Sequence, residues 1–177
     1  MGIIKLIAAV MAVIFAVGCS PKTPEGNVAG GKKETIDKKE ISSFYYYHRG
    51  TMIEDIYDYK FYRDENGAHM TAELSSGWEK LEVDVDDEII KQLEDIAFEY
   101  QMYYWDGFNK TDKRVLDGEG FTLEIAFADG TSVYANGSNA FPDGFSQAED
   151  EFNTIFFELK NIHADKIMEN DPYNYDD

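Results

Sequence analysis

The fold is decided by an alternating stretch in the middle of the chain, Ile56-Tyr57-Asp58-Tyr59-Lys60-Phe61-Tyr62-Arg63. Its odd-numbered aromatic positions share one face of an extended chain, while Asp58, Lys60 and Tyr62 share the other. A period of two is typical of a β-strand with one buried face. The favoured turn sequence Asn66-Gly67 follows, and alternation resumes from Met70 to Leu74. The stretch therefore predicts a hairpin in an antiparallel sheet.

Other stretches on both sides of the hairpin are also predicted to be strands, from their alternation, their aromatic residues or a neighbouring turn. They are Ile41–His48, Trp78–Asp86, Phe121–Phe127 and Thr131–Ala135. Asp129-Gly130 separates the last two and predicts a second hairpin. We therefore expect about six strands.

Two segments have the period of an amphipathic helix instead. The first is capped by Asp86 or Asp87 and runs through about Tyr103. The second is predicted to begin at Ser146, whose spacing to Glu149 is that of a capping box, with an apolar stripe that extends to Ile162. The order β-β-β-β-α-β-β-α predicts an α+β fold, an antiparallel sheet with both helices on one face.

The N-terminus has the pattern of a secretory signal. Lys5 precedes a twelve-residue apolar run from Leu6 to Val17, which is shorter than the roughly 20 residues that a membrane-spanning helix needs. The quartet Ala16-Val17-Gly18-Cys19 resembles the bacterial lipobox, with Ala16 where Leu is usual. This resemblance implies cleavage before Cys19 and diacylation of its thiol, which is enough for stable anchoring. The alternative is an ordinary thiol that follows a cleaved signal.

These signals divide the chain into three parts. Residues 1–18 are the predicted signal peptide, residues 19–40 a flexible tether, and residues 41–177 one acidic domain. The domain holds 31 acidic and ten basic residues, which is a net charge of −21. We expect an extracytoplasmic protein that is anchored through the lipid at Cys19 in the cell membrane or the outer membrane. The number of membranes in the host cell stays open.

Charge and motifs argue against several functions. The net charge would repel a phosphate backbone, so nucleic acid is not an expected partner. No nucleophile elbow, P-loop, dinucleotide fingerprint or zinc motif occurs, and we predict no catalytic residue, metal or cofactor. The acidic clusters Asp84–Glu88 and Asp171–Asp177 lack the spacing of a calcium loop. His48, His69 and His163 are interpreted as surface or strand-face residues.

Three motifs in the second half of the chain are distinctive. They are Trp105-Asp106-Gly107-Phe108, Val115-Leu116-Asp117-Gly118 and Gly137-Ser138-Asn139-Ala140-Phe141-Pro142. Through them the chain resembles, over about residues 98–160, a domain that recurs in uncharacterised lipoproteins of anaerobic gut-type bacteria. The resemblance implies export and an envelope setting, and it transfers no activity.

The last motif supports two interpretations. It is either a structural turn, with Gly137 supplying a positive φ, or part of a ligand-binding notch. The predicted notch consists of Trp105, Phe108, Ser138, Asn139 and Phe141. The bases Lys110, Lys113 and Arg114 either bind an anion or neutralise nearby acids. The tyrosines of residues 44–62 either pack in the core or stack on sugars.

The predicted function is a lipid-anchored extracytoplasmic binding or interaction module whose partner is a glycan, a peptide or an envelope protein. Two alternatives remain open. One is an envelope hydrolase that uses carboxylates, and the other is an accessory or inhibitor protein that acts on a protein partner.

Overall fold

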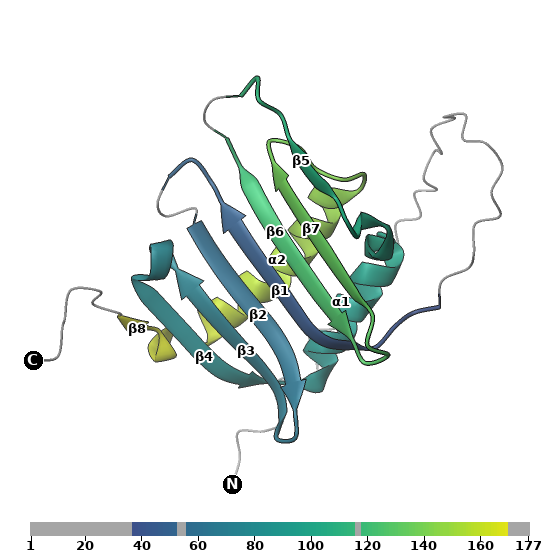
Figure 1. The fold of residues 1–177 in the computed structure, drawn as a ribbon. Helices are drawn as coiled ribbons and strands as arrows, with labels where there is room; N and C mark the ends of the chain where they lie inside the picture. The colour runs from purple at the N-terminus through teal and green to yellow at the C-terminus, as the bar shows by residue number, and fades with distance from the viewer. Residues whose placement is uncertain (1–36, 53–55, 116–117, 170–177) are drawn as a thin grey trace, which may run out of the picture. The chain divides into compact units, whose positions relative to one another are not determined.

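A sheet of eight strands with two α-helices on one face forms the described part of the chain, residues 37–52, 56–115 and 118–169 of the computed structural model (Figure 1). The spatial order is β5-β7-β6-β1-β2-β3-β4-β8. All neighbours pair antiparallel except β5 and β7, which are parallel. The strands are β1 (Ile41–Arg49), β2 (Ile56–Asp64), β3 (Gly67–Leu74), β4 (Glu79–Val85), β5 (Asn109–Thr111), β6 (Gly120–Phe127), β7 (Ser132–Ser138) and β8 (Met168–Glu169). The predicted α+β class and the mostly antiparallel sheet are confirmed.

The predicted strand number and order were incomplete, because the sheet gains a short strand at each edge. β5 has only three residues, all exposed, and β8 has two. Neither is long enough to show a hydrophobic period, so the sequence pattern did not reveal them. The observed order is β-β-β-β-α-β-β-β-α-β.

The β2–β3 hairpin forms as predicted, with its turn displaced by one residue. Asp64 pairs with Gly67, so the two turn residues are Glu65 and Asn66. The Asp64 carboxylate accepts a hydrogen bond from the Asn66 backbone at 2.7 Å, and Gly67 supplies a φ of 132°. A backbone angle in that range strongly favours glycine.

The first helix begins at the predicted N-cap and ends earlier than predicted. Helix α1 (Asp87–Glu99) is capped as predicted by Asp86, whose side chain accepts a hydrogen bond from the Glu88 backbone at 2.9 Å. It ends before Tyr103, because Gln101 adopts a φ of 52° and a 3₁₀ turn follows at Met102–Trp105.

Helix α2 (Phe145–Ile162) does not use the predicted capping box. It begins one residue before Ser146, and its N-cap is Gly144 at a φ of 80° with no side-chain cap. The Glu149 side chain instead accepts a hydrogen bond from the Tyr46 hydroxyl, which makes it part of the contact between helix and sheet. Ile162 is exposed and does not belong to the buried stripe.

The core lies between the helices and one face of the sheet. It is rich in aromatic side chains, and its largest fully buried members include Phe44, Tyr46, Tyr59, Phe61, Phe121, Phe152 and Phe156. The two buried tyrosine hydroxyls have partners, since Tyr46 donates to Glu149 and Tyr59 donates to Asn153 at 2.9 Å. Burial raises the pKa of both tyrosines, so each stays a hydrogen-bond donor.

Residues 37–40, the end of the predicted tether, contact the domain. Lys38 forms an ion pair with Asp95 on α1 at 2.8 Å, and Lys39 forms one with Asp129 in the β6–β7 turn at 3.0 Å. The chain therefore enters β1 at the end of the sheet where the β6–β7 hairpin turns. The predicted signal peptide, Cys19, the tether up to residue 36 and the acidic tail 171–177 lie outside the described residues.

One ion-pair cluster on the sheet predicts a pH effect. His69 lies between two carboxylates, with Nε2 at 2.9 Å from Asp64 and Nδ1 at 2.9 Å from Asp84. The hydrogen bond with Asp64, followed by that with Asp84, raises the pKa of His69 above its ordinary value of 6.5. The contribution of these pairs to the free energy of unfolding should be complete below the unfolded pKa and lost as pH rises through the folded value.

An NMR titration of the His69 ring protons checks this prediction. Asp64→Asn should move the pKa of His69 back toward 6.5, and Asp95→Asn, which is remote, should leave it unchanged. An identical titration of His69 in the Asp64→Asn protein would contradict the assigned cause.

Candidate functional site

The face of the sheet opposite the helices carries polar and tyrosine side chains, and we call it the open face. Side chains alternate along each strand, so those between the buried positions point away from the core. Strand register aligns them in rows across the sheet. One row is Tyr134, Glu124, Tyr45 and Lys60, and the next toward the end of β1 is Asn136, Thr122, Tyr47 and Asp58.

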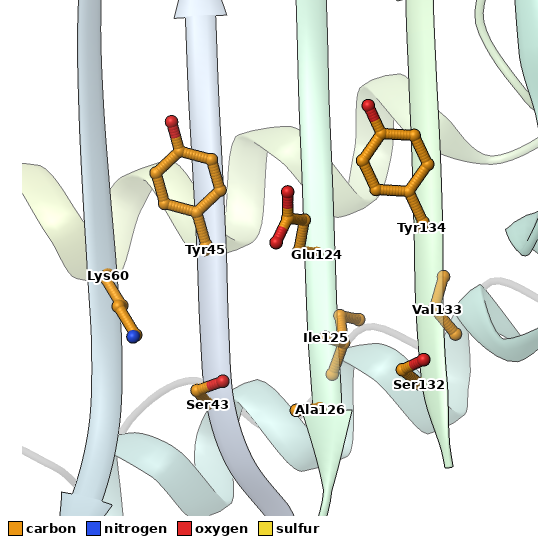
Figure 2. Close-up of a pocket in the computed structure, with 9 residues that line it drawn as sticks. All are labelled: Ser43, Tyr45, Lys60, Glu124, Ile125, Ala126, Ser132, Val133 and Tyr134. Carbon is orange, nitrogen blue, oxygen red and sulfur yellow. The ribbon is translucent and has the colours of Figure 1, made fainter.

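A hollow of about 540 Å³ lies on the open face, and we call it the tyrosine hollow. Its lining comes from four adjacent strands: Ser43, Tyr45, Lys60, Glu124, Ile125, Ala126, Ser132, Val133 and Tyr134. Figure 2 shows the Tyr45 and Tyr134 rings on either side of the Glu124 carboxylate, with Lys60 on the next strand. Two flat rings beside hydroxyl and charged groups suit a ligand that has both apolar and polar surface.

The electrostatics of this hollow keep Tyr45 as a hydrogen-bond donor. Burial, followed by the carboxylates of Asp58 and Glu124, raises the pKa of Tyr45 to about 12. Burial, and then the Glu73 carboxylate, also raises the pKa of Asp58. Asp58 and Glu73 are direct cross-strand partners, and Glu73 forms an ion pair with Lys80 at 3.1 Å.

A second hollow, of about 320 Å³, lies where β1 and β7 end, and we call it the distal hollow. Its polar lining is Arg49, Thr51, Thr111, Asp112, Lys113, Ser138 and Asn139. Arg49 pairs with Gly120 of β6, which in turn pairs with Ser138 of β7. The distal hollow therefore continues the open face by one more row.

A third hollow, of about 380 Å³, is lined mainly by aromatic residues, and we call it the aromatic hollow. Its lining includes Tyr100, Tyr104, Trp105, Phe108, Lys110, Phe141 and Pro142. Trp105 is only 4% exposed and packs on Phe145, whereas Phe141 is 41% exposed and stacks on Phe121. Phe121 belongs to the core, so this hollow lies on the helix side of β6 and β7.

The predicted notch is divided between two of these hollows. Trp105, Phe108 and Phe141 line the aromatic hollow, whereas Ser138 and Asn139 line the distal hollow. The predicted basic trio is divided in the same way. Lys110 lies over the Phe108 ring at 5.1 Å, Lys113 lines the distal hollow, and Arg114 forms an ion pair with Asp112 at 2.6 Å.

Two glycines shape this division, and Gly137 does not act as predicted. Gly137 has no positive φ; a side chain there would lie 2.1 Å from the Ala140 carbonyl and 2.4 Å from the Phe121 ring. The residue with the left-handed angle is Asn139, with a φ of 54° and a backbone N–H that donates to Glu119 at 2.8 Å. Its side chain fills the space that a Cβ on Gly118 would need. The loop is therefore a tight turn whose polar groups line a hollow.

The tyrosine hollow was missed at the level of sequence, although part of its signal is visible there. Four consecutive aromatic residues, 44–47, must point to both faces of a strand, which places Tyr45 and Tyr47 opposite the core. The proximity of Tyr45 to Glu124 and Tyr134 depends on the pairing of β1 with β6, which are separated by four other strands in the chain. No short-range pattern encodes that pairing.

Comparisons and residue clusters add little to an assignment of function. No protein-family model and no curated protein matches this chain. The resemblance to envelope lipoproteins therefore stays a prediction. Within the described residues, no group of three or more His, Cys, Asp or Glu side chains is placed to hold a metal ion. None of the helices in the described part of the chain is long and apolar enough to cross a membrane.

Proposed function

We propose that the chain is a lipid-anchored, extracytoplasmic binding module of the bacterial envelope, and that its ligand lies on the open face of the sheet. The observation that carries the proposal is the tyrosine hollow, where Tyr45, Tyr134, Lys60 and Glu124 converge from four strands. The opposite face is closed by both helices, so the rigid core holds these side chains in fixed positions.

The way in which the chain enters the domain fits this proposal. Residues 37–40 lie at the β6–β7 hairpin, where the Ala128 backbone donates to the Glu40 carbonyl at 2.9 Å. The distal hollow lies at the other end of the same strands, at Arg49 and Ser138. The segment before residue 37, which includes Cys19, thus joins the domain at the end of the sheet away from the distal hollow.

Removal of the two rings tests the binding site. Tyr45→Ala combined with Tyr134→Ala should weaken binding to envelope polysaccharide about tenfold or more, since each aromatic contact contributes roughly 1 kcal/mol beyond its buried area. Cosedimentation with purified bacterial cell walls and titration with soluble oligosaccharides measure this change. Melting curves confirm that the variant is folded.

The matched control removes two rings from the aromatic hollow. Tyr104→Ala combined with Phe141→Ala changes side chains that are also solvent-exposed and lie on the other side of β7. This variant should bind like the original protein. Loss of binding in the control, with retention in the open-face variant, would move the site to the aromatic hollow.

One observation favours the alternative of a hydrolase. Asp58 has a raised pKa and lies opposite Glu73, and glycoside hydrolases pair a carboxylic acid of raised pKa with an ionised carboxylate. The soluble oligosaccharides in the binding experiment separate the two functions. Release of new reducing ends during incubation, abolished by Asp58→Asn, would favour the hydrolase over the binding module.

A further inference from the structure

The distal hollow gathers hydrogen-bond donors from separate segments of the chain. Arg49 comes from the end of β1, Lys113 from the loop after β5, and Ser138 and Asn139 from the end of β7. Guanidinium, ammonium, hydroxyl and amide groups all donate hydrogen bonds, and the first two carry positive charge. A hollow of about 320 Å³ is at the lower end of the range of ligand pockets, roughly 300–1,000 Å³.

The described lining residues of this hollow carry a net positive charge, although the domain is strongly acidic. Its one described acid, Asp112, is engaged by Arg114, which donates to both of its carboxylate oxygens at 2.9 and 2.6 Å. Among the described residues, by contrast, neither Arg49 nor Lys113 has an ion-pair partner. Among the described lining residues, two cations thus remain without an ion-pair partner, and the one acid is already paired.

Backbone glycines leave room for these donors. A Cβ on Gly120 would lie 3.3 Å from Nη2 of Arg49. Because glycine has no side chain, the Arg49 guanidinium can lie across β6 at this position. At Gly118 a Cβ would collide with the Asn139 amide. Glycine at positions 118 and 120 therefore leaves space for the side chains of Asn139 and Arg49.

The distal hollow and the tyrosine hollow lie on one continuous surface. Arg49 is six residues from Ser43 along β1, a span of about 20 Å at roughly 3.3 Å per residue. The row between the two hollows carries Thr122, Asn136 and Tyr47. Hydroxyl and amide groups in this row can bond to a polar chain that lies over the strands.

We propose that the distal hollow is a carboxylate-binding subsite, and that the open face takes an acidic glycan whose uronate group is held by Arg49 and Lys113. This inference rests on the proposed function and names its ligand class. Arginine forms paired hydrogen bonds with a carboxylate, and further sugar rings of the ligand would lie against Tyr45 and Tyr134. A peptide fits less well, because peptides commonly add to a sheet edge, and this ligand surface is the middle of a sheet.

The net charge of the domain does not prevent this binding. At physiological ionic strength the Debye length is about 8 Å, so acids on remote surfaces are largely screened. Arg49 and Lys113 would contact the carboxylate directly and are screened much less. The affinity should therefore fall as sodium chloride is added, as expected for an attraction between opposite charges.

The test compares sugar acids with their uncharged esters. Oligomers of galacturonic, glucuronic and mannuronic acid, each beside its methyl ester, are titrated into the full chain in detergent micelles by calorimetry. We expect at least one acid to bind about tenfold more tightly than its ester, the difference that one charge-assisted contact provides. Arg49→Gln and Lys113→Gln should each remove most of that difference and leave the affinity for the ester unchanged.

Lys166→Gln supplies the matched control, because it removes the same charge from an exposed site outside the three hollows. It should leave both affinities unaltered. Equal affinities for acid and ester, or a variant that weakens both alike, would overturn the carboxylate subsite. If no acid binds while a neutral oligosaccharide does, only the subsite is wrong; if cell walls and all oligosaccharides fail to bind, the proposed function fails with it.

Discussion

Replacement of Cys19 by Ala should leave the precursor uncut and without acyl chains. The lipobox resemblance of Ala16-Val17-Gly18-Cys19 implies that the thiol is diacylated before the signal is removed, so a side chain without sulfur stops both steps. The unsubstituted protein should lose residues 1–18 and gain the mass of its acyl chains. Intact-mass spectrometry of membrane-extracted protein measures both changes.

Ser20→Ala is the matched control for this experiment. It alters the neighbouring residue without touching the thiol, so cleavage and acylation should proceed as in the original chain. A soluble product with a free Cys19 thiol, or efficient cleavage of the Cys19→Ala precursor at the same bond, would show that the quartet ends an ordinary secretory signal.

Elements with a regular period were predictable from the sequence, and elements without one were not. The alternation in residues 56–63 and the Asn66-Gly67 signal predicted the β2–β3 hairpin, because turn and strand signals agreed to within one residue. β5 lacks alternation, and its place in the sheet depends on its backbone pairing with β7. The capping-box signal at Ser146 and Glu149 was overridden, since Glu149 accepts a hydrogen bond from buried Tyr46 across the core.

The candidate site shows a different limit of sequence-based prediction. Trp105 and Asn139 belong to distinctive motifs, yet they line separate hollows because β7 lies between them. Conversely, Tyr45 and Tyr134 are far apart in the chain and meet only through the pairing of β1, β6 and β7. Motif proximity indicates which residues are unusual, and strand register decides which of them face the same ligand.

Phe152→Ala should destabilise the domain by about 3–5 kcal/mol, the usual range for removal of a buried aromatic ring. Phe152 is fully buried on α2, and its ring centroid lies 5.4 Å from that of Phe44 and 4.8 Å from that of Tyr46. Surrounding β-sheet cannot easily collapse into the cavity, because both partner rings are fixed on β1. Equilibrium unfolding in urea, followed by circular dichroism, measures the loss.

Phe157→Ala, on the same helix, shows whether the effect comes from burial. Its ring is 38% exposed and contacts Tyr57 at a centroid distance of 5.4 Å, so its loss should cost about 1 kcal/mol. Phe44 and Tyr46 flank Tyr45 in the chain and point to the opposite face of β1. The packing of Phe152 therefore helps to fix the strand that carries Tyr45 into the tyrosine hollow. Equal destabilisation by the two substitutions would mean that α2 does not close the core against β1, and the rigid support inferred for the open face would then be absent.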